Sequence, residues 1–220
     1  MKTLYLLRHA AARDAGADAD DSKRSLTKAG KAQARLQALR LRGLEKRIDL
    51  ILCSPAVRAV QSARPFLREF GLSGKQLVRE PGLYKGFSRA RFLKVLGKAA
   101  GSAEAILVVG HNPNLSELAQ ALVPSFRKDM AKAALFACRS DGAGFAGLAG
   151  GKAEFLFYEE PGPEFEAYLA LRAEVEKAAS KLFSKNKRRD EPAEAERLEE
   201  LIEKAAHRFS LKLSVKARRL

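Results

Sequence analysis

Short apolar segments alternate with longer amphipathic ones along most of this sequence, and this alternation strongly limits the possible folds. The apolar segments have the length of buried strands, and the longer segments repeat apolar residues at helical spacing. The pattern predicts an α/β domain with a largely parallel sheet. The predicted strands are 2–7, 49–53, 76–79, 105–109, 133–138 and 154–158, and the predicted helices are 25–42, 54–70, 88–98 and 115–122.

Three of these helices begin at residues that we expect to cap them. Thr27 is a good N-cap for the first helix, and Ser54 followed by Pro55 predicts an N-cap and a first helical position. Asn114 can cap the helix that follows it. The glycine-rich stretch 142–151 separates the last two strands, which we expect to form a hairpin or an edge addition.

The pattern changes after Pro163, where we predict a domain boundary. Residues 1–162 would form the α/β domain, and residues 163–220 a basic helical C-terminal extension with helices at 164–185 and 192–209. We expect the extension to pack on the core or to form a dimer contact. The alternative is an electrostatic arm for an acidic partner, centred on the basic linker 185–189.

The charge of the chain favours an anionic partner. The net charge is +15, of which residues 164–220 contribute only +3, so the α/β domain itself is basic. Such a surface suits phosphate, a phosphoprotein, polyphosphate or, less favoured here, nucleic acid. The alternative is a generally basic protein with no such partner.

Other features exclude several classes of protein. The first apolar segment is short and ends at Arg8, and no stretch reaches the roughly 20 apolar residues of a membrane span, so we expect a cytoplasmic protein without a membrane partner. Cys53 and Cys138 lie in apolar strands, which predicts reduced core residues rather than a disulfide framework. No Asp, His or Cys cluster has the spacing of metal ligands, so we predict neither a metal nor a cofactor.

Polar residues directly follow three of the predicted strands. Arg8 and His9 end the first strand, Arg58 follows the second strand by about one helical turn, and His111 follows the fourth. Open α/β sheets bind ligands at the carboxyl ends of their parallel strands. A single histidine is more often structural, but two of the three in this chain are predicted to meet at one edge beside arginines.

Four segments of the sequence also match the motifs of a known family. They are Leu-Leu-Arg8-His9-Ala10, Arg24-Ser-Leu-Thr-Lys-Ala-Gly30, Ser54-Pro-Ala-Val-Arg58-Ala-Val-Gln61-Ser-Ala63 and Val109-Gly-His111-Asn-Pro-Asn114. In this order they resemble the histidine phosphatase superfamily, and within it the small SixA-type phosphohistidine phosphatases. The resemblance covers about residues 1–160. It implies a phosphoglycerate-mutase-like fold, a three-layer sandwich around a mostly parallel sheet.

The resemblance implies a mechanism and roles for the matching residues. His9 would attack phosphorus and become a phosphohistidine, which water then hydrolyses. Arg8, Arg58 and His111 would complete the catalytic set and bind the phosphoryl group, with Arg24 as a further phosphate-binding cation. The neighbouring arginines would lower the pKa of His9 and so keep the nucleophile neutral.

The general acid is the least defined part of the predicted site. Some branches of the family place an Asp or Glu directly after the second histidine, where this chain has Asn112. Mutase-like branches place a Glu after the third strand, which makes Glu80 a candidate acid or simply a loop carboxylate. Ser54 could bond a residue of the site instead of capping its helix. A phosphohistidine substrate needs an acid less than an ester does, because its leaving nitrogen can be protonated beforehand.

Three functions remain open from the sequence. The first is a phosphatase acting on phosphohistidine in a protein. The second is a small phosphomonoesterase acting on a metabolite or a phosphoserine-type ester, and the third is a protein that binds phosphate or a polyanion without turnover. The short connections between the second and fourth strands leave no room for a large lid, and an open site favours a protein side chain as substrate.

Overall fold

Six strands form one mixed sheet at the centre of the structure, a computed structural model that describes residues 1–14, 20–44, 46–86, 88–140, 144–150 and 153–162, with Phe165 and Ala170. The strands are β1 (Lys2–Arg8), β2 (Leu50–Cys53), β3 (Leu77–Arg79), β4 (Ala105–Gly110), β5 (Leu135–Ser140) and β6 (Glu154–Glu159). Their order is β3-β2-β4-β1-β5-β6. The first four are parallel neighbours, and β5 runs antiparallel to both β1 and β6.

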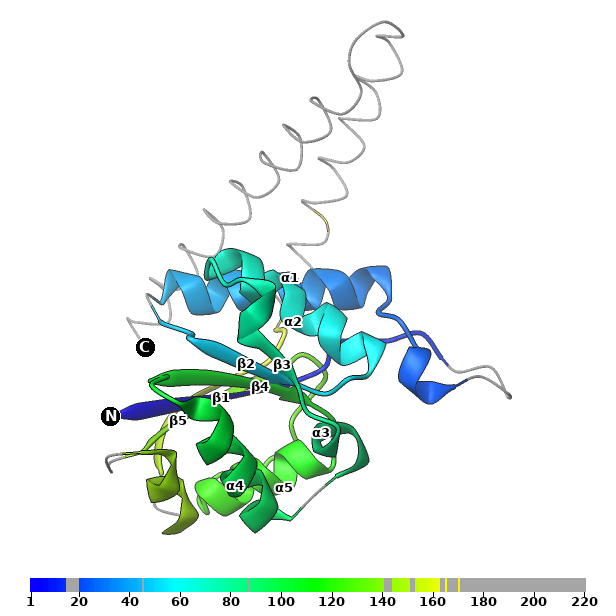
Figure 1. The fold of residues 1–220 in the computed structure, drawn as a ribbon. Coiled ribbons are helices and arrows are strands. Elements are labelled where there is room, and N and C mark those ends of the chain that lie inside the picture. The colour runs from blue at the N-terminus through cyan, green and yellow to red at the C-terminus, as the bar shows by residue number, and fades with distance from the viewer. Residues whose placement is uncertain are drawn as a thin grey trace, which may run out of the picture.

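Helices cover both faces of this sheet (Figure 1). They are α1 (Lys28–Gly43), α2 (Val57–Glu69), α3 (Gly82–Lys85), α4 (Arg89–Ala100) and α5 (Asn114–Leu122), with short 3-10 turns η1 (Asp21–Lys23), η2 (Gly74–Gln76) and η3 (Phe145–Gly150). Helices α1 and α2 lie on one face, and α3, α4 and α5 lie on the other. The predicted three-layer α/β fold is therefore confirmed.

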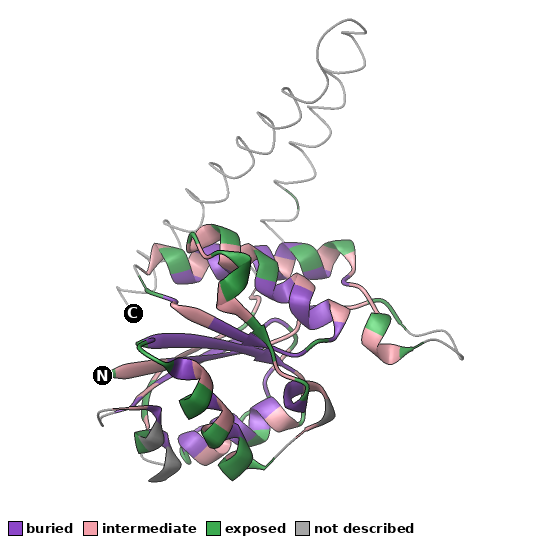
Figure 2. Cartoon of the chain, in the orientation of Figure 1, coloured by how far each residue is buried: buried purple, intermediate pink, exposed green. Residues whose placement is uncertain are grey.

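Alternate residues of each central strand pack into different layers. Leu4 and Leu6 of β1 join the core under α4 and α5, whereas Tyr5 and Leu7 join the core under α1 and α2. All six residues of β4 are buried, and Figure 2 shows the central strands buried between the layers. Fully burying one such side chain contributes about 1.5–3 kcal/mol, so the sheet is a rigid base for the loops at its edge.

The structure corrects two of the three predicted helix caps. Thr27 is the N-cap of α1, and its hydroxyl accepts a hydrogen bond from the Gly30 amide. Ser54 is not the N-cap of α2, because the helix begins three residues later and its cap, Ala56, offers no side-chain acceptor. Asn114 is already the first residue of α5 rather than its cap.

Most of the predicted C-terminal extension lies outside the described residues, including the helices at 164–185 and 192–209 and the basic linker 185–189. Phe165 is described and buried, and it packs with Leu36 and Leu39 of α1. Within the described part of the chain, no helix is long and apolar enough to span a membrane.

The two cysteines are buried free thiols, as predicted. Burial raises the pKa of Cys53 to about 12 and has the same effect on Cys138, so neither is a thiolate near neutral pH. The described residues bring together no group of three His, Cys, Asp or Glu side chains that could hold a metal ion.

Candidate active site

The carboxyl ends of β1, β2 and β4 lie at one edge of the sheet. In the parallel register, Arg8 of β1 pairs with Gly110 of β4, and Cys53 of β2 pairs with Val109. The residues that follow these pairs therefore enter the same space above the sheet edge.

His9, Arg58 and His111 meet in that space. The Nε atom of Arg58 lies 3.3 Å from Nε2 of His9, and the two imidazole centroids are 4.9 Å apart. Arg58 comes from the first turn of α2 and is only 6% exposed. The structure thus brings together three side chains that lie far apart in the sequence.

His9 is held in one tautomer by its own loop. Its Nδ1 lies 2.8 Å from the carbonyl oxygen of Ala10, and this nitrogen carries the ring proton because a carbonyl can only accept. Burial, together with the positive charges of Arg58, Arg8 and Lys132, lowers the pKa of His9 to about 4. The hydrogen bond to Ala10 acts in the opposite direction. Near neutral pH the ring is therefore uncharged, and Nε2 is the unprotonated nitrogen, whose lone pair accepts from Nε of Arg58 and could serve a nucleophile.

Side chains from α1 and α2 fix the loop that follows His9. The Ala10 amide donates to Oγ of Ser62 at 3.0 Å, and the same hydroxyl donates to the Arg58 carbonyl at 2.7 Å. The amide of Ala11 donates to Oε1 of Gln33 at 3.1 Å. These bonds set the position of His9 relative to Arg58.

Gly30 lets α1 approach this loop closely. A Cβ atom at this position would stand 1.9 Å from the carbonyl oxygen of Ala11, which is a backbone atom and cannot rotate away. The amide and the hydroxyl of Thr27 also donate to that carbonyl, at 3.0 and 3.2 Å. Gly30, the last residue of the Arg24–Gly30 motif, therefore allows the backbone of α1 to pack directly against the backbone of the loop after His9.

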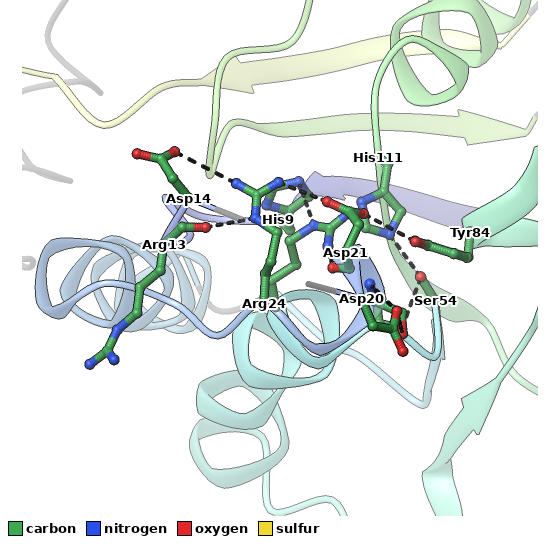
Figure 3. A network of polar contacts seen from close by, with 12 residues as sticks. His9, Arg13, Asp14, Asp20, Asp21, Arg24, Ser54, Tyr84 and His111 are labelled. Carbon is green, nitrogen blue, oxygen red and sulfur yellow. Dashed lines mark hydrogen bonds and ion pairs between the residues drawn. The ribbon is translucent and has the colours of Figure 1, made fainter. Parts of the chain in front are cut away.

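His111 is held by Ser54 at the end of β2. Ser54 is buried, and its Oγ atom lies 2.8 Å from Nε2 of His111. Figure 3 shows the two side chains directed toward each other. This oxygen also accepts from the Ala56 amide at 3.3 Å. Among the described residues Nε2 is the acceptor available to the buried Ser54 hydroxyl, which assigns the hydroxyl proton to this bond and the ring proton of His111 to Nδ1. Burial, with the nearby His9 and Arg58, lowers the pKa of His111 to about 3.

Two buried nitrogen atoms at this edge have no hydrogen-bond partner among the described residues: Nε of Arg8 and Nδ1 of His111. Arg8 is anchored by its Nη1, which donates to the Met130 carbonyl at 2.7 Å. A buried donor without a partner costs about 1–3 kcal/mol, so both atoms favour an incoming acceptor. The charge of Arg8 also lowers the pKa values of His9 and His111.

Asp21 of η1 binds the guanidinium of Arg58. Its Oδ2 accepts from Nη2 at 2.7 Å and from the Tyr84 hydroxyl at 3.1 Å, and its backbone carbonyl accepts from Nη1 at 2.5 Å (Figure 3). Its Oδ1 accepts from Nη1 of Arg24 at 2.8 Å. Bonds from Arg24, Arg58 and Tyr84 hold the pKa of Asp21 well below its usual range, so this carboxylate remains ionised and cannot act as an acid.

Comparison with known proteins identifies the family that has this site. Residues 4–84 match the family model of the histidine phosphatase superfamily (branch 1). An uncharacterized protein of Picosynechococcus sp. is 33% identical over 148 residues, which are 64% of this chain and 86% of that protein. The chain belongs to the histidine phosphatase superfamily.

Solved structures of SixA proteins share the fold of this histidine phosphatase. One from Nakamurella multipartitia, named as a candidate phosphohistidine phosphatase SixA, is 29% identical with a TM-score of 0.61 and covers 73% of this chain and 96% of that one. The protein histidine phosphatase SixA complexed with tungstate is 23% identical with a TM-score of 0.60, covering 72% and 97%. The chain is therefore a phosphohydrolase with a phosphoglycerate-mutase-like fold.

The two remaining residues predicted for this histidine phosphatase site bond other groups than its histidines. Oε1 of Glu80 accepts from the Gly82 amide at 3.0 Å, which supports the start of α3. Arg24 donates to the Arg13 carbonyl at 2.6 Å and reaches Arg58 only through Asp21. Within the described residues, no hydrogen bond or ion pair joins either side chain to His9 or His111.

A cavity of about 230 Å³ adjoins the site of this histidine phosphatase. It is bounded by α3, α4, α5 and His111, and apolar side chains such as Leu83, Phe92 and Leu115 form much of its wall. Sequence patterns did not indicate this cavity, because it forms only where α3, α4 and α5 pack together on one face of the sheet.

Proposed function

We propose that this phosphatase removes phosphate from phosphohistidine in a protein through a covalent intermediate on His9. One observation carries the proposal: a neutral His9 with an unprotonated Nε2 stands beside Arg58 and two unpaired buried nitrogens. These nitrogens, Nε of Arg8 and Nδ1 of His111, can donate to phosphoryl oxygens. Positive charge and preorganised donors around a nucleophile are what phosphoryl transfer requires.

The reaction would proceed in two displacements at phosphorus. In the first, solvent has already protonated the substrate ring on the nitrogen that is not bonded to phosphorus. Nε2 of His9 then forms a bond to phosphorus while the P–N bond of the substrate breaks, and the substrate ring leaves as neutral imidazole. The proton on Nδ1 of His9 stays bonded to the Ala10 carbonyl, which stabilises the positive charge that develops on the ring. In the second, a water oxygen attacks phosphorus, the bond to His9 breaks, the proton of the water passes to solvent and inorganic phosphate leaves.

The chemistry around His9 favours a P–N over a P–O substrate. Asp21 is the carboxylate that contacts Arg58, and its lowered pKa keeps it ionised. Glu80 is bonded to a backbone amide outside this contact network. An alcohol needs a proton from an acid as it leaves, whereas a phosphohistidine nitrogen can be protonated by solvent beforehand.

One observation supports a phosphomonoester as the second candidate substrate. The cavity beside His111 has room for a small organic leaving group, and its apolar wall would suit an uncharged one. Under this alternative Glu80 would have to move toward the leaving oxygen and act as the acid. An acidic protein partner on the basic surface remains a prediction under either candidate.

The decisive measurement is phosphate release from a phosphohistidine-bearing protein and from an aryl phosphate ester at equal enzyme concentration. We expect faster release from the phosphohistidine protein, no release by His9→Ala, and an acid-labile phosphate on His9 in the quenched wild-type enzyme. Glu80→Gln should leave phosphohistidine turnover unchanged. Arg58→Ala should reduce it on the order of a hundredfold or more, because a charged phosphate contact is lost.

The matched control for Arg58→Ala is Arg139→Ala, which removes the same charge from a surface pair with Glu154. This variant should retain wild-type turnover. If the ester is hydrolysed faster than the phosphohistidine protein, and Glu80→Gln loses this ester hydrolysis, the proposal is contradicted and the phosphomonoesterase is favoured. Tight phosphopeptide or polyphosphate binding without any phosphate release, retained in His9→Ala, would favour a binding protein without turnover.

A further inference from the structure

Asp21 occupies the part of Arg58 that a phosphoryl group needs. The hydrogen bonds of the Arg58 guanidinium go to His9 through Nε and to Asp21 through Nη1 and Nη2. Arg58 is only 6% exposed, and the two terminal N–H groups that bond Asp21 become available to a substrate only when Asp21 moves away.

The contacts of the Asp21 carboxylate are those expected of a bound oxyanion. Carboxylates and phosphoryl groups both present oxygens that match the fork of a guanidinium. Oδ2 of Asp21 accepts from Arg58 and from the Tyr84 hydroxyl, and the Tyr84 ring contacts His111 edge-on with centroids 5.5 Å apart. The carboxylate therefore accepts from Arg58 and Tyr84, two side chains that themselves contact His9 and His111.

The segment that carries Asp21 can move without disturbing the core. The turn η1 contains no buried residue, and the Asp21 side chain is 44% exposed although Arg58 beneath it is covered. Its bonds to Arg58, Tyr84 and Arg24 are polar bonds that a doubly charged phosphoryl group and solvent can replace. Small exposed turns of this kind are the parts of a fold that open at low free-energy cost.

We propose that Asp21 competes with the phosphoryl group for Arg58. Asp21 leaves Arg58 when the substrate binds and returns to Arg58 when phosphate departs. The inference rests on the proposed function, since it places the phosphoryl group at Arg58 beside His9. Its consequence is that Asp21 weakens the affinity of the free site for phosphate and so limits inhibition by the product.

The test is the dissociation constant of inorganic phosphate, measured by isothermal titration calorimetry near pH 7.5. Asp21→Asn keeps the shape of the side chain but removes its charge, so we expect phosphate to bind about tenfold more tightly. Asp21→Ala should give the same direction. Asp20→Asn is the matched control, because it removes one charge from the same segment without contacting Arg58, and it should bind phosphate as the wild type does.

The opposite result would overturn the inference. If Asp21 only positions Arg58, both Asp21 variants will bind phosphate more weakly. An equal gain in phosphate affinity in Asp20→Asn would show a general charge effect.

A crystal structure of the wild type with phosphate is the second measurement, and it must show the Asp21–Arg58 bond broken. If phosphate binds the wild type but not His9→Ala, and the Asp21 variants bind it with wild-type affinity, this inference alone is refuted. Absence of phosphate binding in wild type and variants would refute the proposed function as well.

Discussion

Protonation of His9 and His111 at low pH tests the electrostatics of the whole candidate site. The structure places the pKa of His9 at about 4 and that of His111 at about 3, against about 6.5 for an unperturbed histidine. At pH 5 about a tenth of His9 should therefore be protonated, whereas an unperturbed imidazole would be almost entirely protonated. Burial is the main cause in both cases, and the arginines add to it.

The same shift links pH to stability. The folded-state pKa of His9 lies below the unfolded value, so the unfolded chain binds more protons as the pH falls below about 6.5. The stabilisation is present above that pH and is lost progressively toward pH 4. For His9 alone the loss between pH 7 and pH 5 is about 2 kcal/mol, at 1.36 kcal/mol for each pH unit of differential titration.

Histidine NMR provides the assay, since the chain has only three histidines. In the ¹⁵N-labelled protein, we expect the resonances of His9 and His111 to titrate below pH 5 and to report a proton on Nδ1 of His9. Substitution of each histidine by glutamine assigns the signals. Urea unfolding of His9→Gln should depend less on pH than that of the wild type, by about 2 kcal/mol between pH 7 and pH 5. A midpoint near pH 6.5 for His9 would refute the reasoning.

Two substitutions test the positioning of the site. Gly30→Ala should destabilise the fold by about 1–3 kcal/mol and lower activity, because its Cβ would overlap the Ala11 carbonyl. Gly97→Ala is the matched control in α4, where a Cβ meets nothing within 4 Å, and chemical denaturation should show it unchanged or stabilised. Ser54→Ala should cost about 1 kcal/mol in unfolding free energy and reduce kcat about tenfold, since His111 loses its buried partner. Wild-type kcat in Ser54→Ala would show that this bond is not needed.

The sequence predicted the scaffold of the site because periodicity and strand ends are local signals. Apolar runs of strand length placed β1, β2 and β4 correctly, and the parallel arrangement then required their carboxyl ends to meet. His9 and His111 follow those ends directly and Arg58 follows about one helical turn after β2, so local signals were enough to predict their convergence. The structure adds the tautomer of His9 and the distance to Arg58, which depend on side-chain geometry.

The sequence could not predict contacts made across the fold by ordinary polar residues. Asp21 and Tyr84 lie 63 positions apart, and nothing near either one indicates that they share a hydrogen bond. For Ser54 the sequence left two alternatives, a helix N-cap and a bond to a site residue. The structure shows the second, because His111 binds the hydroxyl and the helix begins later. Local propensity was overridden where a buried polar group needed a partner.

The electrostatics of the site also limit which leaving groups it can protonate. A carboxylic acid donates a proton near neutral pH only if its pKa is raised, which requires burial away from positive charge. Beside Arg58 the opposite holds, because the same cation that lowers the pKa of His9 also lowers that of Asp21. A carboxyl group close enough to His9 to reach a leaving atom would be exposed to these charges as well. The charges that favour a neutral His9 therefore disfavour a nearby acid. This supports the proposed P–N substrate, because solvent can protonate the distal nitrogen of a phosphohistidine ring before the P–N bond breaks.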